Sequence, residues 1–267
     1  MKIIRFESLT GDTHYGIYNP ETNQARLIKG NIFGNFTVSE ETAGVKRLLA
    51  PLSPPNVLAL GLYYREHADE TGISYPDVPI LFIKGTNSVT GPGSPIVLPK
   101  EGPNEVDYEA ELAVIIGAEA KNVSRDEAMN CIYGYTCAND VSARDWQMKR
   151  QKGQWSRGKS FDTFCPLGPW IVTADEIPDP GRLAISLTLN GSVMQKSNTS
   201  LMIFDVPAII SQLSRSMTLL AGTAILTGTP SGVGFTRTPP VFLRPGDNVT
   251  VSIEGIGDLT NPVVAES

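Results

Sequence analysis

Two segments of the chain carry carboxylates at spacings that suit chemistry. Glu109 and Glu111 lie two residues apart just before the apolar run Leu112–Ile116, and residues i and i+2 of an extended strand point to the same face. Asp140 follows a second apolar stretch and could bring a third carboxylate to this pair. Carboxylates on one face repel each other at neutral pH and need a proton, a cation or water between them. A solvated strand start is the alternative interpretation of this spacing.

Three carboxylates would form a donor set made only of oxygen, which is the kind of site that suits Mg²⁺ or Mn²⁺. The whole chain has only two histidines, His14 and His67. A histidine-rich zinc site cannot be built from them. The sequence therefore predicts that any metal bound here is magnesium-like.

His67 and Glu70 form a second candidate pair. They are three residues apart, so one helical turn would place both side chains on the same face. A carboxylate beside an imidazole can hold the ring's tautomer and raise its basicity, as a general base requires. A surface pair without a catalytic role is the alternative interpretation, because this spacing is common.

Two further segments could act on an anion. Lys159 lies among glycine and aromatic residues and is a candidate electrophile for a developing enolate, with a solvated lysine as the alternative. The segment Leu226–Gly234 follows an apolar run and resembles an anion-binding turn, in which backbone N–H groups and Thr229 could hold a small carboxylate. It lacks the G-K-[ST] ending of a nucleotide P-loop, so ATP binding is disfavoured.

The elements that must position these residues are mostly strands. Ser124–Glu127 has the pattern of a capping box and predicts a helix that begins near Ala128. Asp205 could cap a second helix that continues to Met217. Apolar, β-rich runs bounded by Gly, Pro, Asn or Asp predict strands at Val57–Leu60, Ile80–Ile83, Leu112–Ile116, Leu183–Leu189, Ala224–Leu226 and Val249–Ile253.

The pattern predicts a mostly β (α+β) fold with a few helices packed outside, because strands outnumber helices without regular βαβ alternation. Short strands at Lys2–Phe6 and His14–Tyr18 are followed by the proline-rich segment Pro51–Pro55, whose prolines lack N–H groups and resist helix formation. We therefore expect a small N-terminal β domain over residues 1–52 and a catalytic domain over residues 53–267.

Composition narrows the class of protein. The net charge is −6 and there is no polybasic run, so neither nucleic acid nor an anionic membrane is an expected partner. The 41% of hydrophobic residues excludes a disordered chain, and no apolar run approaches the length needed to span a bilayer. Three cysteines without a C-x-x-C pair favour a reducing compartment. We expect a cytoplasmic protein, with the mitochondrion as the alternative, because the first residues lack the pattern of a transit peptide.

Taken together, these motifs resemble the fumarylacetoacetate hydrolase superfamily from about Pro54 to Val264. Two segments, Ser142–Arg150 and Phe161–Pro169, look most like its domain-containing 2 subgroup, whose members look like oxaloacetate tautomerases. The resemblance rests on five motifs in matching order: Gly61-x-x-Tyr64-x-x-His67-x-x-Glu70, Glu109-x-Glu111, Asn139–Asp145, Gly158–Asp162 and Thr227–Gly234.

The resemblance implies a mixed β-sandwich roll that forms a homodimer and binds Mg²⁺ or Mn²⁺. It also implies that residues 67 and 70 lie on a short lid. By position it assigns three sets of residues: the metal ligands Glu109, Glu111 and Asp140; the catalytic residues His67, Glu70 and Lys159; and the substrate-binding residues Tyr64, Arg144, Gln147, Gly228 and Thr229. Lys84 receives no role.

The resemblance further implies an enzyme that acts on small 2-oxo acids with a second carbonyl or carboxylate, through an enolate that the metal stabilises. We predict an oxaloacetate enol–keto tautomerase. An acylpyruvate or fumarylpyruvate-type C–C hydrolase, an oxaloacetate decarboxylase and a 2-hydroxyhepta-2,4-diene-1,7-dioate isomerase are alternatives, as is a 2-oxo-pentenoate-type hydratase. A metal-binding scaffold without activity is disfavoured, because the three carboxylates, His67, Glu70 and Lys159 are all present.

Overall fold

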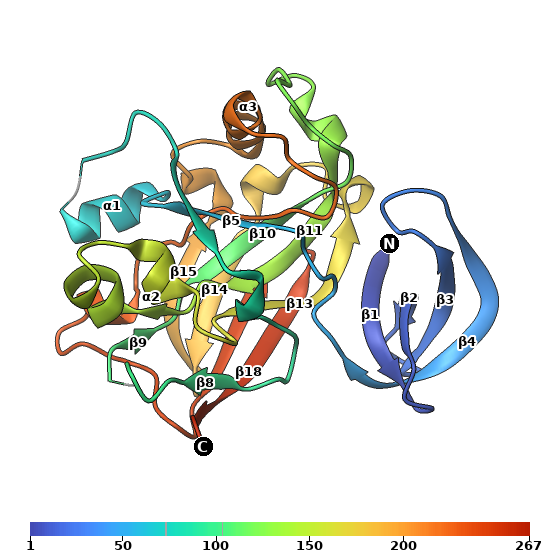
Figure 1. Cartoon of the computed structure of the whole chain (residues 1–267), viewed down its shortest axis with the longest axis horizontal. Coiled ribbons are helices and arrows are strands. Elements are labelled where there is room, and N and C mark those ends of the chain that lie inside the picture. The colour runs from blue at the N-terminus through green and yellow to red at the C-terminus, as the bar shows by residue number, and fades with distance from the viewer. Residues whose placement is uncertain (73, 103) are drawn as a thin grey trace.

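Strands dominate the computed structural model, which describes residues 1–72, 74–102 and 104–267 (Figure 1). The strands are β1 (Lys2–Ser8), β2 (Thr13–Asn19), β3 (Gln24–Gly30), β4 (Phe36–Leu48), β5 (Val57–Gly61), β6 (Ile80–Lys84), β7 (Val89–Thr90), β8 (Ile96–Leu98), β9 (Val106–Asp107), β10 (Ala110–Ile116), β11 (Ile132–Asn139), β12 (Ser142–Ala143), β13 (Cys165–Thr173), β14 (Ala184–Leu189), β15 (Ser192–Asn198), β16 (Ala224–Leu226), β17 (Asn248–Ile253) and β18 (Gly257–Ala265). The helices are α1 (Arg65–Thr71), α2 (Trp155–Lys159) and α3 (Val206–Ser216), with a π-helical turn η3 at Asp145–Arg150 and short 3₁₀ turns elsewhere.

Two large sheets build the main body. The first runs in the order β2-β3-β4-β1-β13-β11-β10-β16-β5-β6, with β7 beside β13, and the second in the order β15-β14-β17-β18-β8. They pack face to face, because β10 and β11 of the first sheet contact β14, β17 and β18 of the second. The mostly β fold predicted from the sequence is thereby confirmed.

Strand β10, which carries Glu111, is rigidly held by the core. All seven of its residues are buried, because each of its faces packs against a different part of the core. Leu112 and Val114 belong to the cluster between the two sheets, whereas Ala113 and Ile115 pack on the other side of the strand, with Phe82 among others. A strand that is buried on both faces has a continuous apolar sequence. In β10 this sequence is Leu112–Ile116, which directly follows Glu111.

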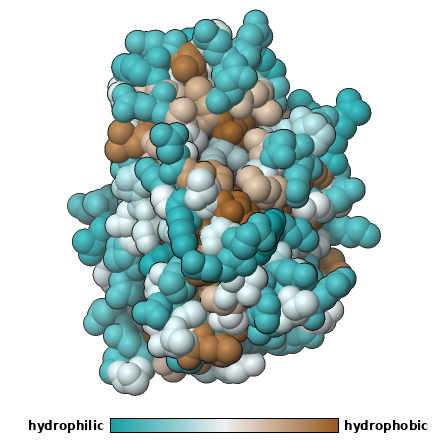
Figure 2. Space-filling view, turned by 90° about the vertical axis from the view of Figure 1, so that its right-hand side faces the viewer, coloured by the Kyte–Doolittle hydropathy of each residue, from teal (hydrophilic) through white to brown (hydrophobic). Residues whose placement is uncertain are grey.

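The N-terminal strands β1 to β4 form one end of the first sheet and lie on the right in Figure 1. Their own small core contains Ile4, Phe6, Ala25 and Val45. Strand β1 also continues the large sheet, because it pairs with β13 at Lys2–Val172 and Ile3–Ile171. Figure 2 shows this side of the molecule, where polar residues cover most of the surface and apolar residues form separate small areas. The division at residue 52 remains a proposal.

The two predicted helices have different outcomes. Asp205 caps α3 by accepting a 2.9 Å hydrogen bond from the N–H of Ala208, and the helix ends at Ser216, so this prediction is confirmed. Ser124 and Glu127 do form the reciprocal capping contacts. The helix predicted after them was wrong, because only a 3₁₀ turn forms at Ala128–Cys131 before β11 begins. In the described parts of the chain, no helix has the length and apolarity to cross a bilayer.

Candidate active site

The three carboxylates predicted from the sequence come together in the structure. Strands β10 and β11 are antiparallel, with Ala110 opposite Asn139, so the start of one strand lies beside the end of the other. The N–H of Asp140 accordingly donates a 2.9 Å hydrogen bond to the carbonyl of Glu109. One ligand atom from each of Glu109, Glu111 and Asp140 lies within 4.8 Å of the others, and all three residues are buried.

Glu111 shows that this cluster could hold a cation. Its Oε2 accepts a 2.7 Å hydrogen bond from the N–H of Gly228, while its Oε1 is buried and has no hydrogen-bond partner among the described residues. Burial, followed by the charges of Asp140 and Glu109, raises the pKa of Glu111 well above its usual range. An unpartnered buried oxygen among carboxylates is what a metal ion would satisfy, so the residues present fit a metal site.

Lys159 lies against two of these carboxylates. Its Nζ is 2.9 Å from Oε2 of Glu109, 2.7 Å from Oδ2 of Asp140 and 2.7 Å from Oγ of Ser142. Burial lowers the pKa of Lys159, but Asp140 and Glu109 outweigh it and the net shift is upward. An ammonium group has three N–H donors, and these three acceptors account for all of them. Lys159 therefore offers the pocket its positive charge and no spare proton donor.

Lys84 is a site residue that the sequence analysis left without a role. It ends β6, is 1% exposed and donates to Oδ1 of Asp140 and to the carbonyls of Val141 and Lys159. Asp140 thus lies between two buried cations. A lysine at the end of an apolar strand is usually solvent-exposed, so the sequence carried no signal for this contact.

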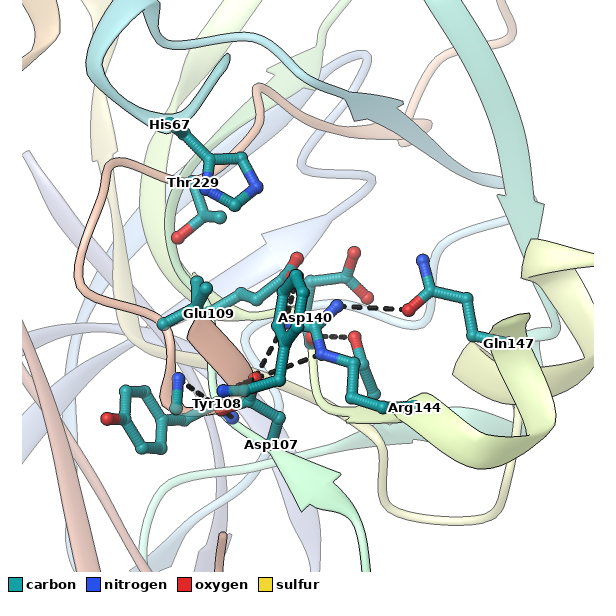
Figure 3. A network of polar contacts seen from close by, with 12 residues as sticks. His67, Asp107, Tyr108, Glu109, Asp140, Arg144, Gln147 and Thr229 are labelled. Carbon is teal, nitrogen blue, oxygen red and sulfur yellow. Dashed lines mark hydrogen bonds and ion pairs between the residues drawn. The ribbon is translucent and has the colours of Figure 1, made fainter. Parts of the chain in front are cut away.

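Arg144 bridges Glu109 to a fourth buried carboxylate, Asp107 (Figure 3). Its Nη2 lies 2.8 Å from Oδ2 of Asp107 and 2.7 Å from Oε1 of Glu109, and its Nη1 donates a 3.0 Å hydrogen bond to Oε1 of Gln147. Burial raises the pKa of Glu109, but Lys159 and Arg144 outweigh it and lower the pKa to about 2. Glu109 is therefore ionised even without a bound cation.

Helix α1 holds the predicted imidazole–carboxylate pair. Nδ1 of His67 lies 3.3 Å from Oε2 of Glu70. Glu70 also accepts hydrogen bonds from the N–H of Gly232, at 3.1 Å, and from Oγ1 of Thr236, at 2.7 Å. Burial raises the pKa of Glu70, but the hydrogen bonds from His67, Thr236 and Gly232 outweigh it and lower the pKa. Glu70 thereby orients the imidazole and links α1 to residues 226–234, the glycine-rich loop.

The glycine-rich loop binds carboxylates, but those of the chain itself. Besides Gly228 and Gly232, which donate to Glu111 and Glu70, Gly234 donates a 2.8 Å hydrogen bond to Oδ1 of Asp107. The N–H groups of these three residues are thus paired within the chain, and the binding of a small external carboxylate by the loop stays a prediction. Gly228 has a φ of +83°, and a Cβ there would lie 2.2 Å from Cβ of Tyr63, so only glycine fits.

A pocket of about 90 Å³ opens beside these groups. Tyr64 and Gly228 are not among its lining residues. Tyr64 is fully buried, and its hydroxyl has no hydrogen-bond partner in the part of the chain that the structure describes. The lining has a polar part made of His67, Thr71, Glu109, Arg144, Gln147, Lys159 and Thr229, and an apolar part that includes Leu60, Leu62, Phe82, Met148, Trp155 and Phe235. In Figure 3, His67 and Thr229 lie on one side of the carboxylates, and Arg144 and Gln147 on another.

Comparison with known proteins decides the family. Residues 56–264 match the family model described as "Fumarylacetoacetate (FAA) hydrolase C-terminal". The chain belongs to the fumarylacetoacetate hydrolase family. Residues 1–51 match a second model, described as "Rv2993c-like, N-terminal". The family resemblance seen in the sequence is confirmed.

Named relatives show that this fumarylacetoacetate hydrolase family member is an enzyme. The chain is 49% identical over 218 residues to "Oxaloacetate tautomerase fahd2, mitochondrial" of Xenopus laevis, covering 81% of this chain and 68% of the relative. Its structure resembles a 2-hydroxyhepta-2,4-diene-1,7-dioate isomerase from Mycobacterium marinum, with a TM-score of 0.85, 41% identity and coverage of 100% and 99% of the two chains. It also resembles a fumarylacetoacetate hydrolase from Exiguobacterium antarcticum, with a TM-score of 0.88, 38% identity and full coverage of both chains.

Proposed function

We propose that this protein is an oxaloacetate enol–keto tautomerase that uses Mg²⁺ or Mn²⁺. The observation that carries the proposal is the position of the carboxylate cluster beside a pocket that His67 also lines. The identity of 49% to a relative named as an oxaloacetate tautomerase supports this reaction over the others that the family contains.

We infer that Glu109, Glu111 and Asp140 hold the metal ion. All their donor atoms are carboxylate oxygens, and the described residues near them add no histidine or cysteine ligand to the cluster. Such a hard donor set favours Mg²⁺ or Mn²⁺. When bound, the ion would act as a Lewis acid that stabilises the enolate of a 2-oxo acid.

His67 is proposed to move the proton. Tautomerisation transfers one proton between the enol oxygen, which is bonded to C2, and the neighbouring carbon C3. One group that takes and returns a proton is therefore sufficient. Because Nδ1 of His67 faces the carboxylate of Glu70, an N–H on Nδ1 leaves Nε2 as the basic nitrogen. Nε2 can then take the proton from one substrate atom and return it to the other.

Lys159 and Arg144 are proposed to supply positive charge where the enolate develops. Both are buried and both line the pocket, so their charges act in a medium of low polarity. The side-chain N–H donors of Lys159 all point to protein acceptors. Its contribution is therefore electrostatic and it does not transfer the proton. Gln147 and Thr229 are proposed to bind substrate oxygens from the same lining.

A C–C hydrolase that acts on acylpyruvates remains the second candidate function. The observation that favours it is the apolar part of the pocket, which contains Leu62, Met148 and Trp155. An apolar acyl group would bury surface there, whereas the second carboxylate of oxaloacetate would need a polar partner. Fumarylpyruvate-type hydrolase, decarboxylase, diene-dioate isomerase and hydratase activities are outcomes of the same test.

A ¹H NMR time course distinguishes these reactions. Purified protein with Mg²⁺ is given enol-oxaloacetate or acetylpyruvate, with a protein-free sample containing the same Mg²⁺ as the control. We expect faster conversion of enol to keto oxaloacetate with all four carbons retained. Faster appearance of acetate and pyruvate would identify a hydrolase, and faster release of CO₂ with pyruvate would identify a decarboxylase; either result would contradict the proposal.

We also propose a homodimer in the cytoplasm. Apolar side chains at the edge strand β6 support a partner surface, since Val78, two residues before this strand, and Ile83 within it are each 55% exposed. Light scattering on the purified protein measures the oligomeric state. A monomer at the concentration of the assay would contradict the dimer. The Xenopus laevis relative is named as mitochondrial, so cell fractionation is needed to distinguish the two locations.

A further inference from the structure

Gln195 is a buried polar residue that reaches the site from the opposite sheet. It lies in β15, in the second sheet, and is 1% exposed. Its Oε1 accepts a 2.9 Å hydrogen bond from the N–H of Ala110. Its Nε2 donates two 2.8 Å hydrogen bonds, to Oγ1 of Thr229 and to the carbonyl of Pro230. One side chain therefore joins β10 to the glycine-rich loop.

These partners fix which way the amide of Gln195 points. The N–H of Ala110 can only donate and the carbonyl of Pro230 can only accept, so Oε1 and Nε2 cannot be exchanged. The hydroxyl of Thr229 must then accept from Nε2. Its single proton is therefore directed away from Gln195, and Thr229 lines the pocket. This arrangement leaves Thr229 free to donate a hydrogen bond to an acceptor oxygen of the substrate.

The Ala110 contact also bears on the carboxylate cluster. Ala110 stands between Glu109 and Glu111 in the chain, so its N–H belongs to the backbone segment that carries both proposed ligands. If Gln195 lost its Oε1, this buried N–H would have no acceptor, and an unpaired buried donor is costly enough to displace the backbone. The loop on the other side of Gln195 carries Gly228, whose N–H binds Glu111.

We propose that Gln195 is a positioning residue for this site. It holds the strand segment that carries the metal ligands and directs the hydroxyl proton of Thr229 toward an acceptor oxygen of the substrate. The inference rests on the proposed function, because it takes Glu109 and Glu111 as metal ligands. A lone glutamine in a strand carries no motif, so the sequence analysis did not single it out.

Four variants of the full-length protein test the inference: Gln195→Leu, Thr229→Val, the double variant, and Lys196→Ala as the control. Lys196 is the exposed neighbour of Gln195 in the same strand. Mn²⁺ affinity is measured without substrate, from the electron paramagnetic resonance signal of free Mn²⁺. We expect Gln195→Leu to weaken Mn²⁺ binding about tenfold, and Thr229→Val and Lys196→Ala to leave it within about twofold.

Steady-state kinetics at saturating Mn²⁺ then separate the two parts of the role. We expect Gln195→Leu and Thr229→Val each to raise KM for enol-oxaloacetate about tenfold, with a smaller change in kcat. The double variant should be no worse than the more damaging single variant, because both changes remove the same hydroxyl contact. Gln195→Met, which is closer in length, replaces Gln195→Leu if circular dichroism shows that the leucine variant is unfolded.

Two results would overturn the role of Gln195. One is unchanged Mn²⁺ affinity and unchanged KM in a folded Gln195 variant. The other is a double variant whose KM rises by the product of the two single effects, about 100-fold, because independent sites multiply in this way. If the wild type binds Mn²⁺ but does not accelerate enol conversion, the proposed reaction fails while the Mn²⁺ comparison still tests Gln195.

Discussion

The Nζ of Lys159 lies 2.7 Å from Oδ2 of Asp140, and both side chains are almost completely buried. Lys84 binds the other oxygen of the same carboxylate. In this region three buried cations, Lys84, Arg144 and Lys159, face four buried carboxylates, Asp107, Glu109, Glu111 and Asp140. One carboxylate is in excess, and burial together with the charges of Asp140 and Glu109 raises the pKa of Glu111. A metal cation at the proposed ligands would offset that excess.

Loss of a single proposed ligand should weaken metal binding strongly. Glu109→Gln keeps the size of the side chain but removes one charged donor, so we expect at least a tenfold loss of Mn²⁺ affinity by titration without substrate. Glu105→Gln is the matched control, because the carboxylate of Glu105 pairs with the exposed Lys149. Unchanged Mn²⁺ affinity in Glu109→Gln would remove Glu109 from the ligand set.

Replacing Lys159 should affect stability and activity differently. Lys159→Met leaves Glu109 and Asp140 short of a buried partner, and breaking such a pair costs about 3–5 kcal/mol of unfolding free energy. Added Mn²⁺ should restore part of this loss, because it supplies positive charge to the same oxygens. Urea unfolding with and without Mn²⁺ measures both quantities, with Lys149→Met as the exposed control. An equal loss in both conditions would show that Lys159 and the metal act at separate places.

The proposed base can be separated from the metal site. His67→Ala should retain Mn²⁺ affinity but lower kcat about 10²- to 10⁴-fold, the usual contribution of a general base. His14→Ala is the control, since His14 lies in β2 of the N-terminal strands. The NMR assay of enol conversion gives the rates. Conversion at the wild-type rate in His67→Ala would assign the proton transfer to another group.

Stability should depend on pH through Glu70. The pKa of Glu70 is lower in the folded protein than its ordinary value of 4.5, so the native state favours the ionised form. This stabilisation is fully present above pH 4.5 and is lost as the pH falls through the lower folded pKa. Thermal unfolding of the wild type and of Glu70→Gln should therefore differ most above pH 5 and converge in acid.

The control for this pH dependence is Glu66→Gln on the same helix, where the side chain contacts Ser197 and not His67. This variant should follow the wild type at every pH. A wild type and a Glu70→Gln variant whose difference stayed constant from pH 7 to pH 3 would show that Glu70 ionisation does not stabilise the fold.

The sequence identified elements and chemistry where the signal is local. The spacing of His67 and Glu70 predicted a shared helical face, and the structure places both on α1. The apolar run after Glu111 predicted a buried strand, which β10 confirms. Asp205, as an N-cap residue, predicted the start of α3, and the structure confirms this start. Each of these depends on residues a few positions apart, whose relation is set by helix or strand geometry.

Only the tertiary structure determined which distant residues these side chains contact. Nothing in the sequence around Lys84 or Gln195 indicates that they meet Asp140 and Ala110, residues 56 and 85 positions away. The amides of the glycine-rich loop looked free to bind a substrate anion, yet folding brings Glu70, Asp107 and Glu111 to them. The sequence by itself determined which groups can ionise and which strands carry them. Only the packing of the sheets and loops determined which donor faces which acceptor, because buried polar groups must find partners wherever the fold places them.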